Sequence, residues 1–424
     1  MCQCLTNFLI KITCAIQLFL IQYPNCITNA ILSFFYLIDL LIYSSFGAKE
    51  FLIKRSELIG PNFPSLGKII VGDYVQVAEI IQSPQQRGFY LGRARLLPSK
   101  IPKSFLLFLS DQEAGGNDLH SVLHDDIWEN VMPIAMKRLS DPAFSRYISE
   151  AVEKTRTIPK DTKTFSKEIQ KMVVRYVFHA IFGFALNDEQ VDIFYELFFS
   201  NSPSSDYITG AVKPFGRFVT CCQGKRSKNI DKVMQIILLS PLMSDYAPSE
   251  RNAYRTREEY AENLLAVTGI AGCVGTSALC LQVFLAIPGD FPINLSDHRE
   301  LMLAVLEAAR VRSPVNNINV ILKRDMDFLI GKKKIKFSPG TVVAASIGLA
   351  STDPAVFSNP NTYDPKRENL LKATLNFNHV GFNSVGSGKR QCPGRNLAMK
   401  LASDLLIEIR HKESKAYRPP TTRD

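Results

Sequence analysis

One cysteine, Cys392, lies in a loop rich in glycine and basic residues, within the stretch VGSGKRQCPGRNLA at 385–398. Glycine lets a backbone turn sharply and lie close to another group, so this loop is expected to approach a ligand. A zinc site has no support, because the nine cysteines include no CxxC pair and no histidine stands at zinc-ligand spacing. Cys392 is therefore the cysteine whose surroundings best suit chemistry.

The same glycines do not form a phosphate-binding loop. Gly381 and Gly386 have the spacing of GxxxxGK[ST], but Ser387 stands where lysine is needed and no Ser or Thr follows Lys389. The dinucleotide pattern GxGxxG also fails, since Gln391 stands at the third glycine.

Two roles stay open for Cys392 from the residues alone. It could act as a nucleophile, for which His379 is the nearest base in the sequence. It could also be a small buried hydrophobe, as free cysteine commonly is, although such residues rarely lie in a basic Gly/Pro-rich loop.

Glu307 and Arg310 stand three residues apart on a predicted helix that ends before Pro314, so they share one helix face. A surface ion pair, which contributes little to stability, is the simpler explanation of such spacing. Arg367, in the turn-rich NPNTYDPKRE, is a second arginine that could bind a carboxylate and hold the cysteine loop to this helix.

Four motifs together resemble the cytochrome P450 superfamily, and they occur in that family's order. VGSGKRQCPG resembles its cysteine-ligand loop Phe-x-x-Gly-x-Arg-x-Cys-x-Gly, with Val385 in place of Phe. Glu307-x-x-Arg310 resembles the Glu-x-x-Arg helix, and STDPAVFSNPNTYDPKRE (351–368) resembles the segment Asp-Pro…Phe-x-x-Pro…Phe-x-Pro-x-Arg. AGCVGTS (271–277) resembles the oxygen-binding helix motif Ala-Gly-x-x-Asp/Glu-Thr-Thr/Ser. Four motifs in one order are a specific signal.

The resemblance implies a haem b cofactor (iron protoporphyrin IX) whose iron is bound by the Cys392 thiolate. Such ligation donates electron density to iron and favours O–O cleavage. It implies further cofactor-binding residues in the loop and at the family's His-x-x-x-Arg helix: Gly386, Gly388, Gly394, Arg390, His120 and His124. It implies catalytic residues on the oxygen-binding helix: Ala271, Gly272, Gly275 and Thr276. Glu307, Arg310 and Arg367 are then structural residues.

The sequence departs from the family pattern at Gly275, where an acid that helps Thr276 deliver protons is usual. Haem-thiolate enzymes that rearrange fatty-acid hydroperoxides work without reductant-driven oxygen activation. KRQCPGRNLA and NLLKATLNF (369–377) are similar to that branch. Only 32 residues follow Cys392, so a shortened C-terminus of the domain is expected.

Helices are expected to position these residues, with few and short strands. A long helix runs from about Arg257 to Ile287, another begins at the N-cap Ser296 and ends before Pro314, and a last one follows Cys392. Strands are expected at VNNINVIL and KIKFSPGTVVAAS. The fold class is mainly α with small β-sheets (α+β). The resemblance makes it the cytochrome P450 fold, with the haem between the long central helix and the cysteine loop.

Residues 1–47 are expected to form an N-terminal membrane anchor, followed by a catalytic domain at 48–424. AILSFFYLIDLLIYSSF (30–46) and FLIKITCAIQLFLIQY (8–23) compete as the spanning run. The basic residues that follow favour a cytosolic catalytic domain. The uncharged run 264–287 is assigned to the buried central helix, because its row of glycines suggests close packing rather than a span.

The leading hypothesis is a membrane-anchored monooxygenase of the endoplasmic reticulum that inserts one oxygen atom from O2 into an apolar, lipid-like substrate. An NADPH-dependent reductase would dock at Lys389, Arg390 and Arg395 and supply electrons. One alternative is a fatty-acid hydroperoxide isomerase or lyase that needs no reductase. Another is an inactive haem-binding or membrane protein. Nucleic-acid binding is not expected, since the net charge of +10 is spread along the chain.

Overall fold

The structure is a computed structural model of the chain, and helices dominate it. It describes residues 3–23, 31–32, 48–65, 68–82, 113–114, 117–118, 127–199, 231–244, 257–322, 324–378 and 391–416. The sheets are small and have two to four strands. The expected fold class, mainly α with small β-sheets, is confirmed.

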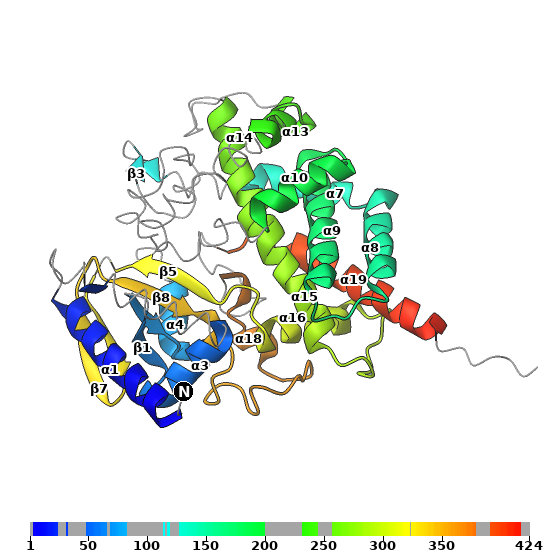
Figure 1. Cartoon of the computed structure of the whole chain (residues 1–424). Coiled ribbons are helices and arrows are strands. Elements are labelled where there is room, and N and C mark those ends of the chain that lie inside the picture. Colours follow the sequence, from blue (N-terminus) through cyan, green and yellow to red (C-terminus); the bar gives the residue numbers. More distant parts are fainter. Residues whose placement is uncertain are drawn as a thin grey trace, which may run out of the picture.

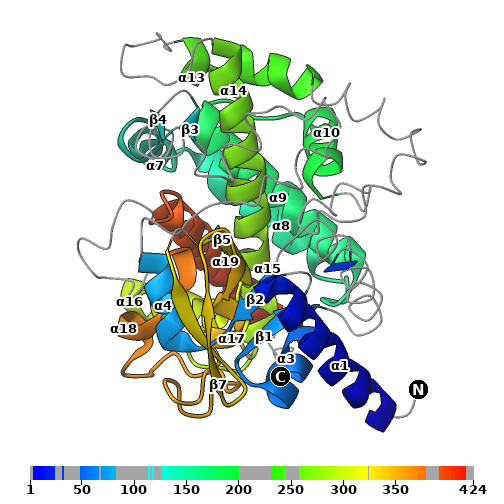
Figure 2. The same ribbon diagram turned by 90° about the vertical axis from the view of Figure 1, so that its left-hand side faces the viewer.

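A long central helix runs through a bundle of helices (Figures 1 and 2). It comprises α14 (Arg257–Ala266), the π-helical segment η5 (Val267–Gly275) and α15 (Thr276–Ala286), within one residue of the predicted bounds. The other helices of the bundle include η3 (Ile127–Val131), α7 (Met132–Arg138), α8 (Pro142–Thr155), α9 (Lys163–Phe182), α10 (Asp188–Phe198), α13 (Pro241–Ser244), α16 (His298–Val311) and α19 (Arg395–Ala416), and residues 231–238 are helical as well. Segment α15 packs against α9, α16 and α19.

The apolar run 264–287 forms part of this central helix, as the sequence predicts. Leu264, Cys273, Cys280 and Val283 are all buried within the protein core. The helix is therefore apolar because other helices cover it, which is the usual reason for a helix without a polar face.

A four-stranded sheet forms the core of the other half of the molecule (Figure 1). Its strands, in spatial order, are β1 (Asn62–Ser65), β2 (Lys68–Val71), β8 (Val342–Ser346) and β5 (Asn317–Ile321). Strand β2 is parallel to β8, and the other two pairings are antiparallel. The two-stranded sheets are β3 (Glu113–Ala114) with β4 (Asn117–Asp118), and β6 (Met326–Ile330) with β7 (Lys333–Phe337).

Shorter helices connect the sheet to the bundle. They are α3 (Ala48–Ile59), α4 (Tyr74–Gln82), α17 (Ile347–Ala350), α18 (Leu370–Ala373) and the 3-10 turn η6 (Asn376–Asn378). The N-cap of α16 is Asp297 rather than the predicted Ser296. The Asp297 carboxylate accepts the N–H groups of Arg299 and Glu300 at 2.8 and 3.3 Å, and its charge suits a helix N-terminus.

The first helix, α1 (Gln3–Gln22), lies against the sheet rather than apart from the domain. Its Cys14 thiol donates to the Pro64 carbonyl at 3.4 Å, and the buried Arg55 of α3 donates to the Cys14 sulfur at 3.0 Å. Within the described ranges, no helix has both the length and the apolarity to cross a membrane. The expected spanning anchor thus has no support at 8–23, and most of the alternative run lies outside the described residues.

Two glycines of the central helix have opposite surroundings. A Cβ on Gly269 would lie 2.0 Å from Phe198 Cζ, whereas a Cβ on Gly275 would meet no atom of the described residues within 4 Å. We expect Gly269→Ala to lower the free energy of unfolding by about 1–3 kcal/mol through overpacking. Gly275→Ala should not lower it, because alanine is the better helix former. Urea unfolding of both variants measures the difference, and equal losses would contradict the assigned packing.

Candidate functional site

The backbone of Cys392 is fixed between η6 and the start of α19. Its N–H donates to the carbonyl of Phe377 at 2.9 Å, and the Arg395 N–H donates to the Cys392 carbonyl at 3.3 Å. Phe377 has a φ of +65°, a left-handed conformation that non-glycine residues rarely adopt. The Cys392 backbone is therefore tied to the left-handed residue Phe377 just before α19 begins.

The Cys392 side chain is half-buried, and its burial favours the protonated thiol over the thiolate. Burial raises the pKa of the thiol to about 11, although the Gly394 N–H and the Arg395 charge both act to lower it. A metal ion deprotonates a coordinating thiol outright, so bound iron would supply the charge that an ionised sulfur needs here. The sulfur thus fits a metal ligand, and His379, the candidate base for a nucleophile, lies outside the described residues.

A buried carboxylate joins α16 to the segment that leads toward Cys392. Glu307 accepts two hydrogen bonds from Arg310, at 2.7 and 2.8 Å, and one from Arg367 Nε at 2.9 Å. The Glu307 and Arg310 side chains have no exposed area, and that of Arg367 is 6% exposed. The pair is therefore a core feature, and the simpler sequence explanation, a surface ion pair, is wrong.

The two guanidinium groups also donate hydrogen bonds to backbone carbonyls in a segment without helix or strand, residues 351–362. Arg310 donates to the carbonyls of Ser351 and Pro360, at 2.8 and 2.7 Å. Arg367 donates to the carbonyls of Ser358, Asn359 and Thr362. Arg310 Cζ also lies 4.9 Å from the centre of the Phe357 ring, a cation–π distance. Together these bonds fix residues 351–367 against α16. The cysteine loop itself, which Arg367 was predicted to hold, lies mostly outside the described residues.

One face of the central helix is open where the sequence predicts oxygen-binding residues. Ala271 is exposed, Gly272 and Gly275 are half-exposed, and Thr276 is buried. The first three carry no side chain beyond a Cβ, and the space over Gly275 is free. These small residues would leave room for a flat macrocycle against this face, and Cys392, whose sulfur could bind its iron, stands immediately before α19, which packs on α15. The donor and the small residues present therefore fit a haem.

Five predicted cofactor residues lie outside the described residues: Gly386, Gly388, Arg390, His120 and His124. Gly394 is described, and a Cβ on it would meet no atom of the described part of the chain within 4 Å.

Sequence reasoning missed the partner of the Cys392 backbone, Phe377. A left-handed aromatic residue leaves no pattern in the sequence, so no signal there identifies it. It also missed the Tyr363 hydroxyl, which donates to the Ala304 carbonyl at 3.1 Å and ties the same segment to α16.

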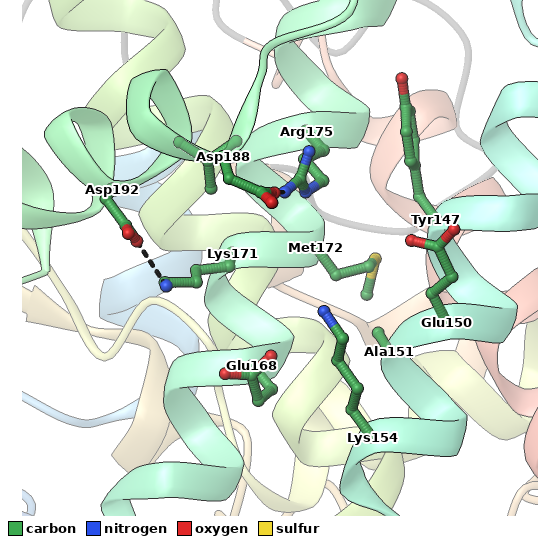
Figure 3. Close-up of a pocket in the computed structure, with 11 residues that line it drawn as sticks. Tyr147, Glu150, Ala151, Lys154, Glu168, Lys171, Met172, Arg175, Asp188 and Asp192 are labelled. Carbon is green, nitrogen blue, oxygen red and sulfur yellow. Dashed lines mark hydrogen bonds and ion pairs between the residues drawn. The ribbon is translucent and has the colours of Figure 1, made fainter.

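A cavity of about 230 Å³ lies between α8, α9 and α10 and is lined mainly by charged side chains (Figure 3). Lys171 pairs there with Asp192, and Arg175 pairs with Asp188. None of the predicted site residues line it. This cavity is therefore separate from the candidate haem site.

The comparisons with known proteins agree on one family. Residues 292–409 match the family model described as Cytochrome P450. The chain is 25% identical over 181 residues to "Divinyl ether synthase CYP74D2" of Solanum tuberosum, which covers 36% of this chain and 38% of that protein. It is 28% identical over 152 residues to "Pulcherriminic acid synthase" of Bacillus subtilis, covering 34% of this chain and 36% of that protein. The matched region thus spans less than two-fifths of either relative.

Solved structures match over a much larger part of the chain. "Retinoic acid bound cyanobacterial CYP120A1" aligns with a TM-score of 0.58 at 16% identity, covering 87% of this chain and 88% of that one. The P450 heme domain of Tepidiphilus thermophilus aligns with a TM-score of 0.52 at 16% identity, covering 86% of both. At this identity the likeness concerns the fold.

Replacing Glu307 by Gln would leave two buried guanidinium groups around a neutral amide. We expect Glu307→Gln to lower the free energy of unfolding by about 3–5 kcal/mol, because it leaves buried charge uncompensated. Asp404→Asn is a matched control, since it removes the carboxylate of the partly exposed Lys400–Asp404 pair and should cost less than about 1 kcal/mol. Denaturant unfolding compares them, and a similar small loss in both would refute the structural role of Glu307.

Proposed function

This chain belongs to the cytochrome P450 superfamily, and on that premise we propose that it is a haem-thiolate monooxygenase of an apolar substrate. The observation that carries the proposal is the placement of Cys392, half-buried and fixed by Phe377 immediately before α19. The cofactor is haem b, and the Cys392 sulfur would bind its iron.

A haem bound through a thiolate would supply redox chemistry on oxygen–oxygen bonds, because the thiolate favours their cleavage. Residues of the chain would position the sulfur that binds the iron. The Glu307 cluster keeps residues 351–367 on α16, and the Phe377 carbonyl sets the backbone from which the Cys392 sulfur projects.

The proton needed by an oxygen-cleaving reaction is assigned to Thr276. Its hydroxyl both donates and accepts, so Oγ1 can hold a proton beside the open face of the helix. Gly275 stands next to it, where other members of the family carry an acid, and a Cβ there would meet no atom of the described residues within 4 Å.

The partners follow from this chemistry and are part of the proposal. An NADPH-dependent reductase would supply electrons near the cysteine side, where Arg395 contributes positive charge. The substrate is apolar and lipid-like. The protein is proposed to act at the membrane of the endoplasmic reticulum, with its catalytic domain in the cytosol.

A second candidate, a fatty-acid hydroperoxide isomerase or lyase, is favoured by the same glycine. Gly275 removes the acid that reductant-driven oxygen activation uses in the family, and free space remains in its place. Two of the sequence relatives are called divinyl ether synthases, and the loop around Cys392 is similar to that branch.

The absorption spectrum of the reduced protein with carbon monoxide tests whether the Cys392 sulfur binds iron. We expect a Soret band typical of thiolate ligation in the wild type and its loss in Cys392→Ala, because alanine cannot bind iron. Cys280→Ala is the matched control, since Cys280 is fully buried in the bundle core and should leave the band unchanged. A thiolate-type band that persists in Cys392→Ala would refute the assignment.

Turnover with two sets of reactants separates the candidate functions. A monooxygenase oxidises an apolar substrate only with O2, NADPH and a reductase, whereas a hydroperoxide isomerase consumes a fatty-acid hydroperoxide with none of them. Gly275→Asp, which the free space admits, should raise the reductase-driven rate relative to the hydroperoxide rate. Hydroperoxide turnover alone would replace the leading proposal by the second, and no turnover in either assay would indicate an inactive haem-binding protein.

A further inference from the structure

The proposed haem chemistry does not use the cavity between α8, α9 and α10 (Figure 3). Three of its lining residues are buried and apolar, one from each helix: Ala151, Met172 and Val191. All the others are charged except Tyr147. Its volume of about 230 Å³ is below the roughly 300–1,000 Å³ of pockets that hold drug-sized molecules. A ligand of this cavity would therefore be small and carry charges.

Two ion pairs fix one wall of this cavity. Lys171 pairs with Asp192 and Arg175 pairs with Asp188, so both pairs join α9 to α10 (Figure 3). The Lys171 and Arg175 side chains are only 23% and 22% exposed. Because each of these four charges already has an opposite charge beside it, the pairs shape the cavity and leave the binding of a ligand to other groups.

Three further charged groups line the cavity. Lys154 and Glu168 form no hydrogen bond or ion pair with any residue in the described ranges. Glu150 lies 3.9 Å from Arg146 Nε, in a pair whose side chains are both more than half exposed, and such pairs contribute little. Figure 3 shows Lys154 extending from α8 into the space between the helices. Within this part of the structure, one ammonium and two carboxylates thus line the cavity without a strong partner.

We propose that this cavity binds a free α-amino acid with a cationic side chain. The carboxylate of the ligand pairs with Lys154, its two cationic groups pair with Glu150 and Glu168, and its methylene groups lie against Met172.

Other ligand classes match these charges less well. A dicarboxylate would place two negative charges among four lining carboxylates with one cation free to receive them. An apolar molecule would remove water from charged side chains without replacing their hydrogen bonds, which is costly. The site is thus distinct in chemistry from the apolar substrate site proposed at the haem.

Titration calorimetry of the full-length protein with three related ligands, at low ionic strength, tests the proposal. L-lysine carries all three charged groups, norleucine is the same chain without the terminal ammonium, and cadaverine is the same chain without the carboxylate. We expect L-lysine to bind with the highest affinity and each of the other two to bind at least about fivefold more weakly, because each lacks one charge-assisted hydrogen bond. The measurement needs no turnover, so its outcome is independent of the proposed function.

Two variants assign the groups of the ligand to residues of the cavity. Lys154→Met should weaken L-lysine binding at least about fivefold and leave cadaverine binding nearly unchanged, since cadaverine has no carboxylate. Glu168→Gln should weaken the binding of both ligands. Lys232→Met/Glu258→Gln is the matched control, because it changes an exposed lysine and an exposed glutamate that do not line the cavity, and it should bind like the wild type.

Far-UV circular dichroism of each variant verifies that the helices remain folded. The proposal is overturned if L-lysine at about 10 mM gives no saturable binding to the wild type. It is also overturned if cadaverine binds the wild type as tightly as L-lysine, or if Lys154→Met and Glu168→Gln bind L-lysine like the control.

Discussion

The buried carboxylate of Glu307 is shared by two guanidinium groups, and the placement of residues 351–367 on α16 depends on it. Burying these charges is costly unless all their hydrogen bonds are made. Here Arg310 and Arg367 complete them with carbonyls between Ser351 and Thr362. These bonds satisfy carbonyl groups of a stretch, residues 351–362, that has little regular secondary structure of its own. Residues 351–367 precede α18, η6 and then Cys392 along the chain, so this segment helps to position the cysteine.

Glycine serves two different purposes on the central helix. At Gly269 it makes room for the Phe198 ring, which packs where a Cβ would be. At Gly275 it leaves free space over a face with only small side chains. The sequence predicts close packing along the whole glycine row, and this holds at one end only. Gly275 also stands at the position where the P450 motif usually has Asp or Glu. The packing around this residue therefore bears on which of the two candidate reactions the protein catalyses.

Much of the fold and part of the site could be predicted from sequence. Motif order predicts the Glu307 cluster, and an uncharged run bounded by Pro288 predicts the central helix. The position of Phe377 could not be predicted, because its left-handed backbone results from tertiary contacts. The orientation of α1 could not be predicted either. Both of its faces are apolar, so periodicity does not distinguish Ile10, which is buried, from Phe8, which is exposed.

The central claim is that the sulfur of Cys392 binds the iron of a haem. Iron K-edge X-ray absorption of the purified protein tests this most directly, because it resolves the elements bonded to iron. The account predicts one sulfur scatterer at a thiolate bond distance in addition to the four haem nitrogens. A first coordination shell of nitrogen and oxygen alone would contradict it.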